Sequence, residues 1–191
     1  LDSVTVIGRI EVDDADRTLA LEGSISLQGE IALNPSGSVD DATLLFDADA
    51  AIIGGGGVIL RNSGFNQSYV RVSPGRVGTI GQNIEVRGSG FVIGEIVNNG
   101  LIVADDPAAS LVLEGAFSGS GLFGADYATL FLGDFAALTD CVLNTLGTGV
   151  IRVGENIVRF IGGRNEGQIE LLPGSALRIE GVHINNGTIA Q

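Results

Sequence analysis

Residues 8–31 read GRIEVDDADRTLALEGSISLQGEI, and residues 100–123 read GLIVADDPAASLVLEGAFSGSGLF. The second stretch repeats the first without a gap, and ten of its 24 positions are identical. A tandem duplication of this kind predicts an architecture of stacked structural repeats. Because catalysis usually needs one unique site, a repeated surface also favours scaffolding, display or binding. The identical pairs are Gly8/Gly100, Ile10/Ile102, Asp13/Asp105, Asp14/Asp106, Leu19/Leu111, Leu21/Leu113, Glu22/Glu114, Gly23/Gly115, Ser26/Ser118 and Gly29/Gly121.

The triplet Gly-x-Ile extends this repeat along the whole chain. On this ladder it starts at residues 8, 29, 57, 78, 100, 149, 167 and 187, and Gly121-Leu122-Phe123 fills the one gap with Phe in place of Ile; two further triplets, at 23–25 and 94–96, lie off the ladder. Successive triplets are 18 to 28 residues apart, and a spacing of 21 followed by one of 28 occurs twice. We predict that each triplet marks one rung of a solenoid. Internal repeats then span residues 8–99 and 100–186, and a third copy starts at 187–191.

The second halves of the two repeats match after small insertions and deletions. Residues 55–59 correspond to 147–151, residues 70–71 correspond to 158–159, and the Asn-Asn-Gly run at 98–100 corresponds to the one at 185–187. In this alignment each copy has four rungs.

Short alternating segments indicate β-strands within each rung. Residues 19–21, 111–113 and 177–179 alternate with the period of two that leaves one face of a strand apolar. Gly-rich and Asn-Gly sequences between such segments provide the positive φ angles of sharp corners. We predict an all-β fold, a right-handed parallel β-helix (β-solenoid) of about nine rungs, formed by residues 1–191 as one continuous solenoid. A β-sandwich is the alternative, although it gives no reason for a 21-residue period.

The composition disfavours several classes of partner. The 191 residues include ten Arg, no Lys and 23 acidic residues, and the net charge of −13 disfavours nucleic acid and anionic membrane surfaces. Of the chain's charged stretches, residues 51–90 alone are net positive, with four Arg against Glu85. Cys141 is the only cysteine, so no intrachain disulfide forms. No apolar run has membrane-spanning length, and we expect no membrane insertion.

Residues 92–104, VIGEIVNNGLIVA, combine a Gly-x-Ile triplet with an Asn-x-Gly-x-Ile element, which also occurs at 165–169 and 185–189. In these features the chain resembles the β-helical repeats of large bacterial secreted and surface proteins, namely filamentous-haemagglutinin-like adhesins and autotransporter passengers. The resemblance covers most of the chain and is architectural. It implies an exported, rod-like, non-catalytic module and provides no catalytic residues to transfer.

Two acidic pairs are the best candidates for a site. Asp13-Asp14 and Asp105-Asp106 occur at the same point of both copies. Carboxylate oxygens are the hard ligands that Ca²⁺ prefers, so these turns are a candidate calcium site. The glycine-rich Ca²⁺ nonapeptide of β-roll proteins is absent, and solvated turn carboxylates are the simpler interpretation. We expect no other cofactor.

The remaining reactive residues do not predict catalysis. His183 is the only histidine and lies where the first copy has Ile96, and Cys141 is expected to fill space in the core. No nucleophile–base pair or phosphate-binding loop stands out. We therefore predict that the chain is not an enzyme.

These patterns favour a structural β-solenoid module of a large extracellular or cell-surface protein of the adhesin type. Neither end of the sequence resembles a cap, so we expect self-association, by end-to-end stacking into a filament or with adjacent repeats of a longer chain. Because the chain does not begin with Met, we expect a processed or excised product. Surface glycans are a further expected partner. The alternative is a polysaccharide-binding or polysaccharide-degrading β-helix protein, which would need clustered carboxylates and aromatic platforms.

Overall fold

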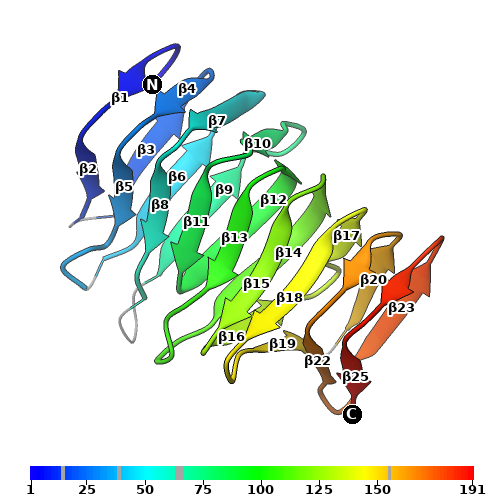
Figure 1. Ribbon diagram of the computed structural model, residues 1–191. Helices are drawn as coiled ribbons and strands as arrows, with labels where there is room; N and C mark the ends of the chain where they lie inside the picture. The colour runs from blue at the N-terminus through cyan, green and yellow to red at the C-terminus, as the bar shows by residue number, and fades with distance from the viewer. Residues whose placement is uncertain (14–15, 38–39, 63–66, 155) are drawn as a thin grey trace.

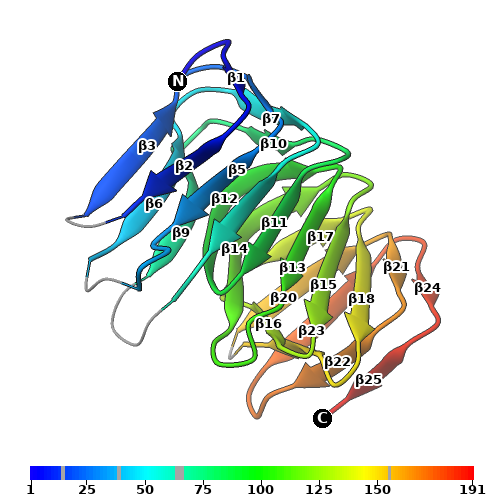
Figure 2. The ribbon, with the colours of Figure 1, turned by 60° about the vertical axis from the view of Figure 1, so that its left-hand side comes forward.

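The computed structural model describes residues 1–13, 16–37, 40–62, 67–154 and 156–191. These residues form an all-β parallel solenoid of about eight turns and contain no helix that could cross a membrane. The chain passes through three faces in a fixed order, and each pass stacks on the previous one (Figure 1). The two termini therefore lie at opposite ends of the stack (Figure 2).

Each face is a column of short parallel strands. The first face consists of β1 (Thr5–Val6), β4 (Ile25–Leu27), β7 (Ala50–Gly54), β10 (Gly78–Ile80), the second halves of β12 (Gly90–Asn98) and β14 (Leu111–Ser118), β17 (Ala137–Thr139), β20 (Ile157–Ile161) and β23 (Ala176–Glu180). The second face consists of β2 (Arg9–Val12), β5 (Glu30–Leu33), β8 (Gly57–Leu60), β11 (Glu85–Gly88), β13 (Leu101–Ala104), β15 (Leu122–Asp126), β18 (Val142–Leu146), β21 (Arg164–Asn165) and β24 (Ile184–Asn185). The third face consists of β3 (Arg17–Leu21), β6 (Ala42–Phe46), β9 (Ser68–Val72), the first halves of β12 and β14, β16 (Thr129–Leu132), β19 (Val150–Val153), β22 (Gln168–Leu171) and β25 (Thr188–Ala190).

All strand pairings among the described residues are parallel. On the second face, for example, Ile10 pairs with Ile31, and Ile31 pairs with Val58. A β-sandwich of the kind considered above is built from antiparallel strands. The sandwich alternative is therefore wrong, and the predicted parallel β-solenoid is confirmed.

Two long strands, β12 and β14, bend from the third face into the first. Gly94 and Gly115 lie at the two bends, with φ of 122° and 118°, and face each other in the strand register. A Cβ atom on Gly115 would lie 2.3 Å from the carbonyl oxygen of Gly94. Glycine is therefore required here, both for the backbone angle and for the close approach of the strands.

The core consists of side chains stacked on their counterparts in neighbouring rungs. Phe117 of the first face and Phe123 of the second meet edge to face inside the solenoid, with ring centroids 5.7 Å apart. Burial of such columns is the main stabilising contribution, at about 25 cal/mol per Å² of apolar surface. One column of the second face runs through Ile10, Ile31, Val58, Val86, Ile102, Phe123, Leu143, Asn165 and Asn185.

The Gly-x-Ile triplets do not all occupy the same point of a rung. Ile10 and Ile102 share one inward column of the second face, as the 24-residue match predicts. Residues 78–80 lie instead on the first face, and residues 149–151, 167–169 and 187–189 lie on or lead into the third. Ile59 is one residue out of register and points outward, because Gly57 rather than Val58 pairs with Glu30.

The expectation of one equivalent triplet per rung therefore holds for residues 8–10, 29–31, 100–102 and 121–123 and is wrong for the other five triplets. The physical reason is that Gly-x-Ile describes a corner followed by a buried aliphatic residue, and this solenoid uses that local geometry at more than one corner. The repeat boundaries 8–99 and 100–186 stay a prediction.

Candidate functional site

The first predicted acidic turn lies at the corner between the second and third faces. Asp13 follows β2, and its Oδ1 accepts a hydrogen bond of 2.9 Å from the hydroxyl of Ser36 in the next rung. Asp14 lies outside the described residues. The described carboxylates of this turn are Asp13 and Asp16, and both already have protein partners.

The second acidic turn occupies the same corner four turns later, after β13. Asp105 Oδ2 lies 3.6 Å from Nη1 of Arg87. Asp106 accepts hydrogen bonds from the Ser89 hydroxyl at 2.8 Å and from the backbone N–H of Ala108 at 3.0 Å. Partial burial raises the pKa of Asp105; Arg87 opposes the rise and Asp106 adds to it.

The described residues bring together no group of three or more His, Cys, Asp or Glu side chains that could hold a metal ion. Asp13 and Asp105 instead serve as partners of a serine and an arginine. Calcium binding at Asp13, Asp14, Asp105 and Asp106 stays a prediction.

Several other acidic residues accept hydrogen bonds from the next rung. The sequence alone did not predict these contacts between rungs. Asp16 Oδ1 accepts from the backbone N–H of Asp41 at 3.0 Å, and Asp41 Oδ1 accepts from the N–H of Gln67 at 3.0 Å. Asp47 and Asp49 accept hydrogen bonds from the following rung in the same way, at 2.7 and 2.9 Å. The acidity of residues 1–50 therefore supports the corners of the solenoid.

A cavity of about 350 Å³ opens on the outer surface of the second face. Its apolar lining includes Leu101, Val103 and Leu122, and its charged lining includes Asp105 and Asp126 from consecutive rungs. No serine, threonine, cysteine, histidine or lysine is among its described lining residues. The cavity therefore combines the carboxylates of Glu85, Asp105 and Asp126 with Arg87 around an apolar surface.

The third face carries a row of apolar side chains on its outer surface, here called the aromatic row and defined as Tyr69, Phe91, Val112 and Phe131. The four residues are direct partners in the strand register and are half-buried. The rings of Tyr69 and Phe91 are 5.4 Å apart at an interplanar angle of 28°. The sequence contains a signal for this row, since each residue sits at an outward position of an alternating segment.

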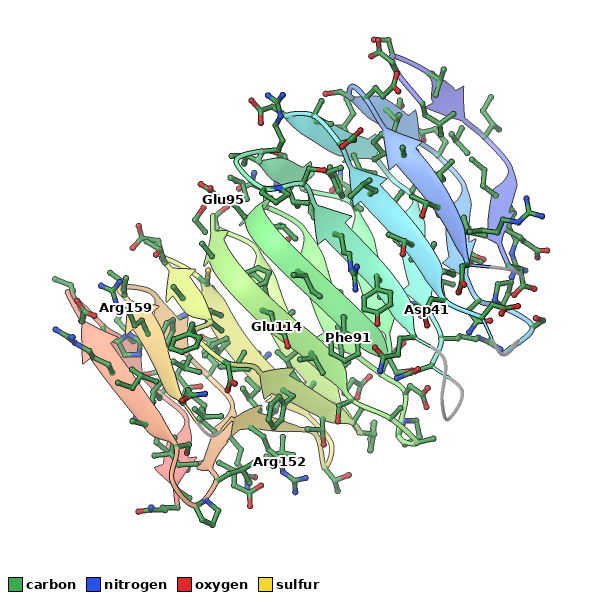
Figure 3. The ribbon with its side chains drawn as sticks, turned by 180° about the vertical axis from the view of Figure 1, so that it is seen from behind. Asp41, Phe91, Glu95, Glu114, Arg152 and Arg159 are labelled. Atoms are coloured by element: carbon green, nitrogen blue, oxygen red, sulfur yellow. The ribbon has the colours of Figure 1, made fainter. Side chains whose placement is uncertain are left out.

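Charged side chains lie beside the aromatic row. The Cζ atom of Arg71 lies 3.8 Å from the centroid of the Tyr69 ring, close enough for a cation–π interaction. Burial and the charges of Asp41 and Glu114 raise the pKa of Tyr69, while Arg71 lowers it. Figure 3 shows Phe91 between Asp41 and Glu114 along this face.

His183 and Cys141 occupy structural positions. Nδ1 of His183 lies 2.8 Å from the carbonyl oxygen of Gly162, and its ring meets Phe160 edge to face at 4.2 Å. Cys141 is fully buried, and burial raises the pKa of its thiol to about 12. A thiol with that pKa is a poor nucleophile at neutral pH.

Comparisons with protein-family models, with curated proteins and with solved structures give no significant match to this chain. The class that the fold defines is the parallel β-solenoid. The predicted resemblance to bacterial adhesins is supported at that level of architecture.

Proposed function

We propose that the chain is a non-enzymatic structural module of an extracellular, adhesin-like protein, and that its rod extends by strand pairing at the end rungs. The observation that carries this proposal is the distribution of burial along the core. The hydrophobic residues that pack against the core while only partly buried all lie near the ends of the stack: Val6, Ile10, Leu19, Leu171 and Leu177.

The last rung continues the inward columns of the rungs before it. Ile179 pairs with Phe160, and Ile189 pairs with Ile169. Ile179 and Ile189 are 45% and 37% exposed, whereas Phe160 and Ile169 are 1% and 0% exposed. A further rung of the same kind would bury these side chains as the interior rungs are buried.

Polar groups of the last rung also favour continuation. Asn165 donates a hydrogen bond of 2.7 Å from Nδ2 to Oδ1 of Asn185. Among the described residues, the Nδ2 group of Asn185 has no such partner, and the outer edge of β24 pairs with no other described strand. Unpaired strand edges are ready templates for another strand.

The occupant of these edges is either an adjacent turn of a longer chain or a second copy. A second copy bound head to tail makes a heterologous contact, which does not close and so produces a filament. Extension in this way suits an adhesive or spacer rod, since each added copy lengthens the rod without changing its faces.

Sedimentation velocity of the purified chain over a concentration series tests the proposal. Wild-type protein should form concentration-dependent assemblies, and Ile179→Arg should remove them because it places a charge in the contact. The matched control is Ile53→Arg, since Ile53 is 50% exposed but points outward from the third strand of the first face, away from the end rungs. A wild-type chain that stays monomeric throughout would contradict self-stacking, and equal disruption by Ile53→Arg would indicate lateral association instead.

A further inference from the structure

The aromatic row presents a narrow apolar strip that follows the axis of the solenoid. Tyr69, Phe91, Val112 and Phe131 come from four successive rungs, so the row spans about 14 Å at about 4.8 Å per strand. Leu45 and Ile93 lie beside it in the neighbouring outward column and are also half-buried. The strip is therefore long and one or two side chains wide.

Polar groups of both signs flank one side of this strip. Arg71 and Glu114 lie on either side of Ile93 in one strand register, two rungs apart. Among the described residues, neither side chain forms a salt bridge within 4.0 Å. An arginine offers up to five N–H donors and a carboxylate offers only acceptors, so together they can bind hydroxyl groups in both of their roles.

We propose that the aromatic row binds a neutral, linear polysaccharide that lies along the solenoid axis. The C–H face of a pyranose ring is apolar and packs against the half-buried ring of Phe91, while hydroxyl groups at the ring edge bond to Arg71 and Glu114. The next sugar along the chain lies over Val112, and the third reaches Phe131. Linear sugar chains suit the strip because their successive rings advance by about one strand spacing, about 4.8 Å.

The size of the strip favours a sugar chain over a folded protein partner. A stable protein interface needs about 800 Å² from each partner, and four to six half-buried side chains provide much less. Contiguous exposed apolar patches can mark ligand-binding grooves.

Charge favours an uncharged sugar. Arg71 and Glu114 cancel each other, Asp41 adds one negative charge near Tyr69, and Arg152 and Glu170 further along the face form a salt bridge of 2.8 Å. The chain as a whole carries −13, so a polyanionic glycan would be repelled. The inference goes beyond the proposed structural role and does not depend on end-to-end stacking, because the row lies on a side of the rod.

Affinity electrophoresis in native gels tests the inference with three soluble probes: hydroxyethyl cellulose, xylan and galactomannan. At least one of these neutral polysaccharides should retard the wild-type chain, and alginate, a polyanion, should retard it less than the best neutral probe. Phe91→Ala should weaken the interaction by about tenfold, since one aromatic contact contributes roughly 1 to 2 kcal/mol.

Two controls separate the site from general effects. Phe135→Ala removes an aromatic side chain that is 74% exposed and lies outside the row, and it should bind like wild type. Glu114→Ala should weaken binding more than Glu114→Gln, which keeps an acceptor oxygen. Thermal unfolding of each variant verifies that it is folded.

Each contrary outcome would overturn the inference. No retardation by any neutral probe, unchanged binding by folded Phe91→Ala, or stronger retardation by alginate would each exclude a neutral-glycan site. If Phe91→Ala instead lowers the mass of wild-type assemblies without changing retardation, the row is a protein contact. We expect Ile179→Arg to lose end-to-end stacking while neutral polysaccharide still retards it in the gel. That result would show that stacking and glycan binding are independent.

Discussion

Gly115→Ala should destabilise the protein strongly because it adds one methyl group at the bend of β14. Gly115 has a φ of 118°, a region that residues other than glycine adopt at a cost of about 1 to 3 kcal/mol. The new Cβ would also lie 2.3 Å from the carbonyl oxygen of Gly94. Relief of that contact moves β14 away from β12 and weakens one or two strand hydrogen bonds, each contributing about 1 kcal/mol.

The sum is a loss of about 4 kcal/mol, a large part of the 5 to 15 kcal/mol by which domains are usually stable. Urea unfolding followed by far-UV circular dichroism measures it as a lower midpoint with an unchanged slope. Gly55→Ala is the matched control, because nothing lies within 4 Å of a Cβ atom there. Its free energy of unfolding should change by less than about 0.5 kcal/mol.

The refuting result is a Gly115→Ala protein that unfolds at the same urea concentration as Gly55→Ala. In that case the bend from the third face to the first does not require glycine, and the close approach of Gly94 and Gly115 is not a feature of the folded protein.

Three further measurements follow from individual side chains. Cys141 should react with a thiol reagent about a thousandfold more slowly in the native protein than in urea, since a pKa of about 12 leaves little thiolate; rapid native labelling would contradict its burial. Asp105→Asn should stabilise the protein at neutral pH, and the gain should vanish in acid. The sign follows from the raised pKa of Asp105, which makes the wild type lose stability as pH rises through that pKa; a melting-temperature difference that is constant with pH would contradict it. Phe117→Ala should cost about 3 to 5 kcal/mol in the same urea assay, because the side chain is 1% exposed and packs on Phe123; a loss below about 1 kcal/mol would contradict the stacked core.

The architecture was predictable because stacking imposes a period on the sequence. The match of residues 8–31 to 100–123 placed Ile10 and Ile102 in one column, as the structure does. Alternation within short segments then indicated strands, and Gly-rich corners indicated a solenoid. These signals are local or periodic, so one sequence is enough to reveal them.

The assignment of rungs outside the two matched segments was less predictable, because identical residues occupy structurally different corners. Gly23 and Gly115 are identical in the repeat, yet only Gly115 lies in an unbroken strand with a positive φ. Gly23 lies between two separate strands, β3 and β4. The sequence indicates that a corner is near. The two faces that the corner joins depend on the register of the whole stack.

The candidate sites illustrate the same limit. The pairing of Asp105 with Arg87 depends on which rungs are neighbours, and so does the row formed by Tyr69, Phe91 and Phe131. Phe91 follows Tyr69 by 22 positions, and Phe131 follows Phe91 by 40. No local sequence feature marks these three residues as neighbours. Their outward positions in alternating segments were readable, but their alignment required the register.

The central claim is that the end rungs are built to receive another rung. Electron microscopy of the purified chain tests this claim most directly. Stacked copies should appear as unbranched filaments with an axial repeat of about 43 Å, because each face of one copy stacks nine strands at about 4.8 Å each. Single particles of 19.6 kDa at every concentration, or particles joined side by side, would contradict it.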